Sequence, residues 1–384
     1  MRDSEVATGG VVAVGHICLD LMPDLGARAL DLDPGALRIA GPLTISTGGS
    51  VSNTGIALHR LGVPTRLVAL AGSDPLGEVL RATLDRESAG LGDGIVTRDG
   101  VATSYSVILS SAATDRIVLH FPGANDEFRS SDVSDAALRG AALVHFGYPP
   151  LMRSICRGDG AELAELLGRA RALGAATSLD MAEPDERAGA IDWPLLLRRV
   201  LPLTDFFLPS AGELRAMLGR PDAAPEPLAE ACLALGAGVV GIKLGRDGIY
   251  LRSGPLERVR AIADRVPDLA AAAWADRQLW APVYEVAVRG TTGSGDTTIA
   301  GFLAGVLGRL APADALNLGC AAGSLCVEAD DALSGIASRE QAEARVRSPI
   351  PRPVPRGVAT AAGWRRRDEG VYAGPLDTAS GNSW

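Results

Sequence analysis

The sequence predicts an α/β protein in which a mostly parallel sheet carries helices on both faces. Short apolar runs alternate along the chain with longer stretches of helical spacing, and this alternation is typical of such three-layer sandwiches. Two predicted helices open on glycine-rich segments, and two alternating segments predict a small antiparallel unit outside the main sheet. A chain of 384 residues is long enough for one large domain of this kind.

The elements follow in chain order. Val11–Gly15 is apolar, β-branched and ends at glycine, which is the pattern of a buried strand. Ser52–Leu61 has helical spacing and stops at Gly62, a residue that commonly ends helices. By the same criteria, further strands are predicted at 65–71, 143–147, 175–179, 206–208 and 239–244, and further helices at 76–85, 161–173, 227–235 and 297–307.

Three segments break this rhythm. Leu37–Thr47 alternates loosely, whereas Thr103–Ser110 and Arg116–Phe121 alternate clearly between apolar and polar residues. The last two predict a hairpin, because they are joined by the short polar segment Ser111–Asp115. With the region near Asp20, these pieces predict a small β flap over one edge of the main sheet; two ordinary edge strands are the alternative.

Lys243 is the only lysine among 37 basic side chains, and the sequence around it excludes two classes of phosphotransferase. A Walker A loop needs a lysine followed by Ser or Thr, but Leu244 follows Lys243. A protein kinase needs a glycine-rich loop before its lysine and a His-Arg-Asp loop after it, and the sequence has neither.

Charge and cysteine content limit the partners. The formal net charge of −9 argues against nucleic acid or an anionic membrane as a partner. Five cysteines without Cys-x-x-Cys spacing suggest a reducing compartment, and neither a signal peptide nor a spanning apolar run is visible. We therefore expect a cytoplasmic protein.

The first chemical motif is the segment Gly290–Asp296, which precedes the apolar helix predicted at 297–307. Glycines before a helix expose backbone N–H groups, and the helix dipole makes this end favourable for an anion such as a phosphoryl group. Asp296 would stand beside that anion, where a carboxylate is unfavourable unless it accepts a proton from an attacking hydroxyl. The alternative is a simple helix cap after a flexible turn.

The second motif is Thr47–Asn53, which also opens a helix. The paired glycines Gly48 and Gly49 allow close approach to the backbone, and Asn53 offers a donor and an acceptor to hydroxyl groups. The segment does not match Gly-x-Gly-x-x-Gly, so it does not predict a dinucleotide site. A glycine-rich turn with a helix cap is the alternative.

Together the two motifs resemble the two signature regions of the ribokinase family, also called the PfkB family of carbohydrate kinases. The resemblance spans roughly Val11–Val346, and several further segments are similar to family motifs. These segments are Gly15–Asp20, Gly72–Gly77, Pro122–Asn125, Pro209–Glu213 and Lys243–Gly248. The resemblance implies a ribokinase-like three-layer sandwich with a small β lid.

The resemblance also implies domain limits and residue roles. The kinase domain would span residues 1–346, with lid segments at about 18–47 and 101–123, and it would transfer a phosphoryl group from ATP, with Mg²⁺, to a sugar-like alcohol. The roles it implies are these: Asp296 as catalytic base beside the anion hole of Gly293, Ser294 and Gly295; Asp20, Gly48, Gly49, Asn53 and Asn125 at the substrate; Lys243, Gly245, Gly248, Thr292 and Asn317 at the nucleotide; and Glu213 holding Mg²⁺ through water.

The sequence departs from the family pattern at two positions. Gly290 stands where the family usually has an Asp that helps to bind a monovalent cation, so activation by such a cation is in doubt. The guanidinium of Arg289 could supply the missing charge, or it could face solvent. Ser210 replaces the Asn of the Asn-x-x-Glu motif, and Glu213 could instead be an ordinary exposed helix acid.

Several interpretations remain open at this stage. A nucleoside kinase is the first alternative function, and a catalytically weak sugar- or nucleotide-binding regulatory protein is the second. A homodimer through the lid is expected from the resemblance, with Val107–Leu109 as its apolar face. Residues 347–384 form a tail rich in Pro and Arg, which is either disordered or a strap lying on the domain.

Overall fold

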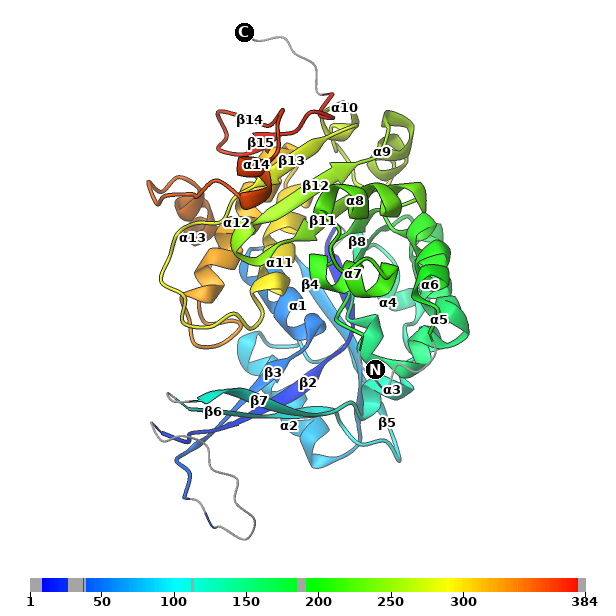
Figure 1. The fold of residues 1–384 in the computed structure, drawn as a ribbon. Helices are drawn as coiled ribbons and strands as arrows, with labels where there is room; N and C mark the ends of the chain where they lie inside the picture. Colours follow the sequence, from blue (N-terminus) through cyan, green and yellow to red (C-terminus); the bar gives the residue numbers. More distant parts are fainter. Residues whose placement is uncertain are drawn as a thin grey trace.

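The computed structural model describes residues 9–26, 37, 39–111, 114–184, 191–336 and 338–378. Within them, an eleven-stranded sheet has the order β14-β15-β13-β12-β11-β10-β9-β8-β1-β4-β5 (Figure 1). The seven strands from β5 to β11 run parallel, and the other four are antiparallel. The bounds are β1 Val11–Gly15, β4 Thr65–Gly72, β5 Ile95–Arg98, β8 Leu143–Gly147, β9 Ala176–Leu179, β10 Phe206–Phe207, β11 Val239–Lys243, β12 Ile249–Ser253, β13 Gln278–Ala281, β14 Arg365–Arg366 and β15 Tyr372–Ala373.

Successive residues of the strands point to opposite faces of the sheet. Val11 and Phe206 pack with α1, α11 and α12 on one face, whereas Val12 and Phe207 pack with α5, α6, α7 and α8 on the other. The helix bounds are α1 Ser50–Arg60, α2 Pro75–Glu87, α3 Ala124–Glu127, α4 Asp135–Leu138, α5 Arg153–Ala172, α6 Trp193–Val200, α7 Ala211–Leu218, α8 Pro225–Ala234, α9 Leu256–Ala263, α10 Ala271–Trp274, α11 Ser294–Leu307, α12 Pro312–Val327, α13 Arg339–Val346 and α14 Arg356–Thr360. The predicted three-layer α/β sandwich is confirmed.

A second sheet of four strands lies at one end of the molecule, with the order β3-β2-β6-β7 (Figure 1). Its strands are β2 Cys18–Pro23, β3 Leu43–Gly48, β6 Tyr105–Ser111 and β7 Thr114–Phe121. The antiparallel pair β6 and β7 confirms the predicted hairpin, and the parallel pairing of β2 with β6 joins it to the region of Asp20. We call this sheet the lid.

Two details differ from the sequence expectations. The helix predicted at 161–173 begins earlier, at Arg153, but its backbone is broken at Arg157–Gly160, where Gly158 and Gly160 adopt positive φ. The expected apolar lid face Val107–Leu109 is half-buried, and the exposed apolar side chains lie on β7 and β3 instead. β6 is an inner strand of the lid and lies between β2 and β7, whereas β7 and β3 are its two outer strands.

The segment after α13 lies on the main sheet. β15 pairs with β13, and Trp364 packs edge-on against Trp280 at 5.5 Å between ring centroids. Arg277 and Asp377 form an ion pair between the sheet and this segment, with Nε–Oδ1 at 2.6 Å. Residues 347–378, which we call the C-terminal strap, therefore extend the sheet at its antiparallel edge. In the described part of the chain, no helix is long and apolar enough to cross a membrane.

Candidate active site

The carboxyl edge of the parallel strands gathers polar side chains that are far apart in the sequence. Five neighbouring strands, β1, β8, β9, β10 and β11, each end at this edge, which is where open α/β sheets bind their ligands. The polar residues at or just beyond the strand ends are His16, Tyr148, Asp180, Ser210 and Lys243. The two glycine-rich helix starts of α1 and α11 complete the site, since α1 packs against both β1 and α11.

The turn before α11 has the geometry that its glycines predict. Gly293 adopts a left-handed conformation with φ of 73°, and a Cβ at this position would overlap Ala332. The Ser294 hydroxyl donates to the carbonyl oxygen of Thr291 at 2.8 Å, which closes the turn. The first N–H groups of α11 have no acceptor within the helix and carry its positive dipole end, so this turn can hold an anion.

Asp296 lies in the first turn of α11 and is 1% exposed. Its Oδ2 accepts hydrogen bonds from Asn53 Nδ2 at 3.0 Å and from the Tyr148 hydroxyl at 2.8 Å. Its Oδ1 accepts from the Thr54 hydroxyl at 3.2 Å. Burial raises the pKa of the Asp296 carboxyl, and Lys243 together with the three donors opposes that rise. The group is thus a buried carboxylate held in one orientation beside the anion turn.

Lys243 supplies the buried positive charge of the site. Its Nζ lies 2.6 Å from Oδ1 of Asp180, and the lysine and aspartate side chains are 13% and 0% exposed. A Cβ at Gly295 would lie 3.6 Å from the same Nζ, which places the ammonium beside the anion turn. Burial lowers the pKa of Lys243, but Asp180, Glu213 and Asp296 raise it above its ordinary value, so the lysine stays charged.

Gly48 and Asp20 are close neighbours on the paired strands β3 and β2. A Cβ at Gly48 would overlap the Asp20 carboxylate, so the glycine is required for the position of this side chain. Burial raises the pKa of Asp20. Gly49 begins α1 with φ of 85°, and a Cβ there would clash with the backbone of His16. Both glycines therefore allow their neighbours, Asp20 and His16, to pack directly against the backbone where β1, β2 and α1 meet.

The two predicted asparagines have different surroundings. Asn53 donates to Asp296, while its buried Oδ1 has no hydrogen-bond partner and is available to a ligand hydroxyl. Asn125 is fully buried, and its amide donates to the carbonyl oxygen of Ile17 and accepts from the N–H of Ile17. Asn125 therefore clamps the chain between β1 and β2.

The other predicted nucleotide residues lie on three elements: Gly245 and Gly248 between β11 and β12, Thr292 before α11, and Asn317 on α12. Gly245 and Gly248 adopt φ of 56° and 85°, and a Cβ at Gly248 would overlap the carbonyl oxygen of Ala281. The Thr292 carbonyl oxygen accepts from the Cys326 thiol at 3.4 Å. Asn317 on α12 donates to the Glu369 carbonyl oxygen at 2.8 Å and accepts from Arg352, so the C-terminal strap engages both ends of its amide.

Glu213 is the third residue of α7 and forms a capping box with Ser210, the residue that precedes the helix. Its Oε2 accepts from the Ser210 N–H at 2.6 Å, and the Ser210 hydroxyl accepts from the Glu213 N–H at 3.2 Å. Among the described residues, no group of three or more His, Cys, Asp or Glu side chains could enclose a metal ion. The donor set fits a Mg²⁺ ion that is carried mainly by phosphates and water, with Glu213 and the unpartnered Oδ2 of Asp180 nearby.

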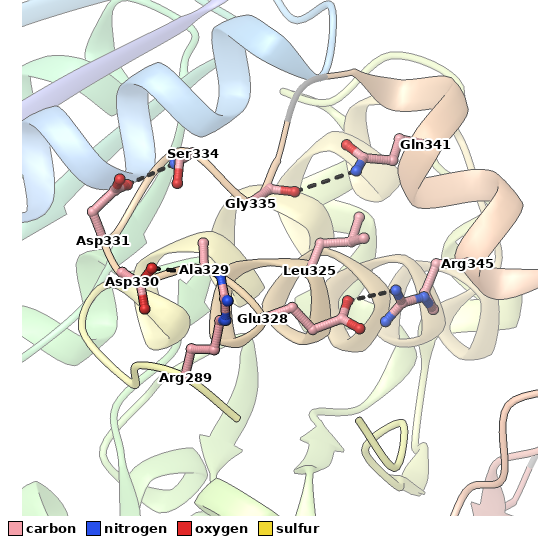
Figure 2. Close-up of a pocket in the computed structure, with 10 residues that line it drawn as sticks. All are labelled: Arg289, Leu325, Glu328, Ala329, Asp330, Asp331, Ser334, Gly335, Gln341 and Arg345. Carbon is pink, nitrogen blue, oxygen red and sulfur yellow. Dashed lines mark hydrogen bonds and ion pairs between the residues drawn. The ribbon is translucent and has the colours of Figure 1, made fainter. Parts of the chain in front are cut away.

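The contact that the structure gives for the Arg289 side chain is an ion pair with Asp330. Its Nη1 lies 3.5 Å from Asp330 Oδ2, and both side chains are largely exposed. Both residues line a pocket of about 380 Å³ (Figure 2), which Glu328, Gln341 and Arg345 also line. Gly290 packs against the carbonyl oxygen of Ala329, at 3.1 Å from where a Cβ would stand. Lys243, whose Nζ lies 3.6 Å from where a Cβ of Gly295 would stand, is the positive charge beside the turn.

Sequence reasoning missed three residues of the site: Tyr148, Asp180 and Thr54. The first two directly follow predicted strands, so their position at a carboxyl strand end was the available signal. Thr54 lies one residue beyond the glycine-rich motif and had no such signal.

The comparisons with known proteins agree with this architecture. The sequence pattern of pfkB family carbohydrate kinases matches residues 9–338. An uncharacterized sugar kinase of Archaeoglobus fulgidus is 26% identical over 73% of this chain and 98% of its own. The 2-dehydro-3-deoxygluconokinase of Bacillus subtilis is 25% identical over 80% of this chain and 88% of its own.

Solved structures share the fold at low sequence identity. The ribokinase of Thermotoga maritima superposes with a TM-score of 0.68 at 20% identity, covering 88% of this chain and 99% of its own. A fructokinase of Xylella fastidiosa with bound ATP has a TM-score of 0.66 at 18% identity, covering 88% and 98%. Fold and site together define a phosphotransferase that acts on an alcohol group, and the chain belongs to the pfkB family of carbohydrate kinases.

Proposed function

We propose that this protein transfers the γ-phosphoryl group of ATP to a hydroxyl group of a sugar-like acceptor, with Asp296 as the base. The observation that carries the proposal is the buried Asp296 carboxylate in the first turn of α11, directly after the glycine turn Gly293–Gly295. The sugar-kinase relatives support a sugar as acceptor, and neighbours solved with ATP support ATP as donor.

The reaction needs a base, and in this proposal Asp296 acts as one because it follows the glycine turn directly. It takes the proton of the acceptor hydroxyl while the hydroxyl oxygen forms a bond to the γ-phosphorus. The bond from that phosphorus to the bridging oxygen breaks, ADP leaves, and Asp296 later releases its proton to solvent. Because burial raises the pKa of Asp296, it is a stronger base than an exposed aspartate.

The phosphoryl group would lie on the turn before α11. The backbone N–H groups of Gly293 and Gly295 and the helix dipole would face the anion, and the Lys243 ammonium lies beside Gly295. The Ser294 N–H lies 3.3 Å from the Thr291 carbonyl oxygen, so it would join them only by giving up that contact. Fixed charges of this kind stabilise the transition state without reorganisation during the reaction.

The acceptor would bind between the lid and α1. Asp20 and the unpartnered Oδ1 of Asn53 would accept hydrogen bonds from its hydroxyl groups, while Gly48 and Gly49 would contribute by allowing Asp20 and His16 to pack against the backbone. Asn125 contributes indirectly by fixing Ile17 at the start of the lid.

The nucleotide would lie along Gly245, Gly248, Thr292 and Asn317. A Mg²⁺ ion bound to its phosphates would neutralise part of their charge, with Glu213 holding it through water. Asn317 is engaged by the C-terminal strap, so the strap would border the nucleotide as well.

A homodimer through the lid is part of this proposal. β7 is the outer strand of the lid, and its Val118, Leu119 and Phe121 side chains are 49%, 56% and 40% exposed. An open strand edge that carries apolar side chains is suited to pair with a second copy of the same chain.

The test is an acceptor panel of hexoses, pentoses, sugar acids and nucleosides with Mg-ATP, read as a mass increase of the acceptor. We expect phosphorylation of a sugar or sugar acid, and a rate lower by about three orders of magnitude for Asp296→Asn. Asp314→Asn is the matched control, because Asp314 is an exposed acid in the first turn of the adjacent helix α12. Near-wild-type turnover by Asp296→Asn would refute the base, preference for nucleosides would favour a nucleoside kinase, and no turnover at all would favour a binding protein.

A further inference from the structure

Tyr148 has a backbone conformation that is costly for its side chain. It follows β8 with φ of 62° and ψ of 41°, in the left-handed region, and it stands between Gly147 and Pro149. A bulky residue rarely adopts this region, and such outliers gather at functional sites. The conformation directs the phenol to a specific target, since its hydroxyl donates to Oδ2 of Asp296 at 2.8 Å.

The hydrogen bonds of Asp296 leave one acceptor position of its carboxylate unused among the described residues. Each carboxylate oxygen accepts about two hydrogen bonds. Oδ2 already accepts from Asn53 and Tyr148, whereas Oδ1 accepts only from Thr54 among the described residues. An incoming hydroxyl therefore finds its free acceptor site on Oδ1.

We infer that Tyr148 is a positioning residue for Asp296: its phenol occupies the second acceptor site of Oδ2 and so leaves Oδ1 as the oxygen that faces the acceptor hydroxyl. This inference rests on the proposed function for its catalytic meaning, because it assumes that Asp296 is the base. The hydrogen bond itself does not depend on that assumption.

The charges around the carboxylate favour this role for the phenol. Burial raises the pKa of Asp296, and the hydrogen bond from Tyr148 lowers it. Burial and the neighbouring Asp296 also raise the pKa of Tyr148 well above its ordinary value, so the phenol stays protonated and acts as a donor. The ionisable groups that face this pair from the surrounding elements are His16, His145, Asp180, Glu213, Lys243 and Cys326.

Thr54, the donor to Oδ1, is itself fixed by a buried chain of polar groups. The Thr54 hydroxyl lies 3.5 Å from that of Ser50, which lies 3.4 Å from Nε2 of His145. Nδ1 of His145 lies 3.0 Å from the Ser178 hydroxyl. Burial lowers the pKa of His145 to about 3, so the imidazole is neutral near pH 7. The chain therefore places no second positive charge beside Asp296.

The test is a carboxyl-carbon NMR titration of the protein with ¹³C-labelled aspartate, in which Asp296→Asn identifies the resonance of Asp296. We expect Tyr148→Phe to raise the titration midpoint of this resonance by about one pH unit, because one hydrogen bond to the charged form is lost. Phe adopts the same backbone conformations as Tyr, and Tyr250→Phe is the control, since it removes another buried phenol that bonds Gln278. An unmoved midpoint in Tyr148→Phe, or an equal shift in Tyr250→Phe, would overturn the inference.

A second measurement covers the case in which Tyr148→Phe does not fold. Biosynthetic 3-fluorotyrosine makes the phenol a stronger donor, so the midpoint of Asp296 should fall in the labelled wild-type protein; an unchanged or raised midpoint would contradict the inference. The acid limb of kcat/KM should follow the midpoint in each protein, while KM changes little. A loss of kcat with an unmoved acid limb would mean a merely structural role. Turnover by Asp296→Asn tests the base separately, so failure of the proposed function is distinguishable from failure of this inference.

Discussion

Nζ of Lys243 lies 2.6 Å from Oδ1 of Asp180, in an ion pair whose carboxylate is fully buried. The only lysine of the chain is thus the positive charge within a group of three carboxylates, those of Asp180, Glu213 and Asp296. Burial and the other two carboxylates raise the pKa of Asp180, and Lys243 opposes that rise. Lys243 therefore has two roles: it neutralises the buried Asp180 carboxylate, and it provides a positive charge beside the turn that could hold an anion.

Lys243→Met should lower both activity and stability. Losing one fixed charge at the phosphoryl group should reduce kcat on the order of 100-fold. Leaving the buried Asp180 without its partner should cost about 3–5 kcal/mol in the free energy of unfolding, measured by urea titration at pH 8. An unchanged free energy of unfolding would contradict the importance of this pair.

The loss in Lys243→Met should depend on pH. Asp180 has a raised pKa in the folded state, so its contribution to stability is full below its unfolded pKa of about 4 and is lost as pH rises through the folded value. We therefore expect the destabilisation to shrink as the pH is lowered from 8 toward 5. The double variant with Asp180→Asn should recover most of the stability at pH 8, which a double-mutant cycle can measure.

Gly48→Ala should impair acceptor binding specifically. The added Cβ would overlap the Asp20 carboxylate and displace it from the acceptor side. Overpacking of about 1–3 kcal/mol corresponds to a rise in the KM for the acceptor of roughly tenfold or more, with the KM for ATP unchanged. Gly168→Ala in α5 is the matched control, since a Cβ there meets nothing within 4 Å. Equal KM values in both variants would argue against Asp20 as an acceptor contact.

The elements that could be predicted from the sequence are those encoded locally. Val11–Gly15 and Leu143–Gly147 were recognised because an apolar, β-branched run bounded by glycine is itself the signal for a buried strand. The turn at Gly293 could be predicted because glycines directly before an apolar helix expose backbone N–H groups, and the structure adds that Gly293 has a left-handed backbone, which glycine adopts readily. The family resemblance then supplied the chemical role of Asp296, which local pattern alone left open.

The remaining features depend on partners that no local pattern specifies. Tyr148 reaches Asp296 only because β8 ends beside the start of α11 in the folded chain. The pairing of Lys243 with Asp180 likewise joins the ends of two strands. The pairing of the Asn125 amide with Ile17 is also a contact that its motif does not specify, since a buried polar group takes whatever partners the fold brings near it.

Catalysis should not require a monovalent cation. Gly290 has no carboxylate with which to bind one, and Lys243 already provides a permanent charge beside the anion turn. We expect equal rates in potassium and sodium chloride at the same ionic strength. Arg289→Ala should also retain its rate, because Arg289 pairs with the exposed Asp330 instead of the turn. Strong potassium activation of the wild-type protein would refute this prediction, and a large loss in Arg289→Ala would revive Arg289 as the substitute charge.

Leu119→Lys should dissociate the proposed homodimer. Leu119 is 56% exposed on the outer lid strand β7, where a charge would oppose pairing of two apolar edges. We expect the mass of a dimer for the wild-type protein and of a monomer for the variant in size-exclusion chromatography with light scattering. Val288→Lys is the control, since Val288 is 63% exposed and lies outside the lid. A monomeric wild-type protein would contradict the proposal.

Asp377→Asn should reveal whether the C-terminal strap is part of the folded unit. Asp377 and Arg277 form a bidentate ion pair at 2.6 and 3.2 Å, with side chains only 4% and 7% exposed, and the variant would leave a buried guanidinium without its counter-charge. We expect a loss of about 3 kcal/mol in the free energy of unfolding, measured by urea titration. Asp268→Asn is the matched control, because it breaks an ion pair with Arg309 whose side chains are both 63% exposed, and it should change stability by less than about 1 kcal/mol. Since β15 completes the sheet and the strap holds Asn317, equal stability of the two variants would mean that the strap merely rests on the domain.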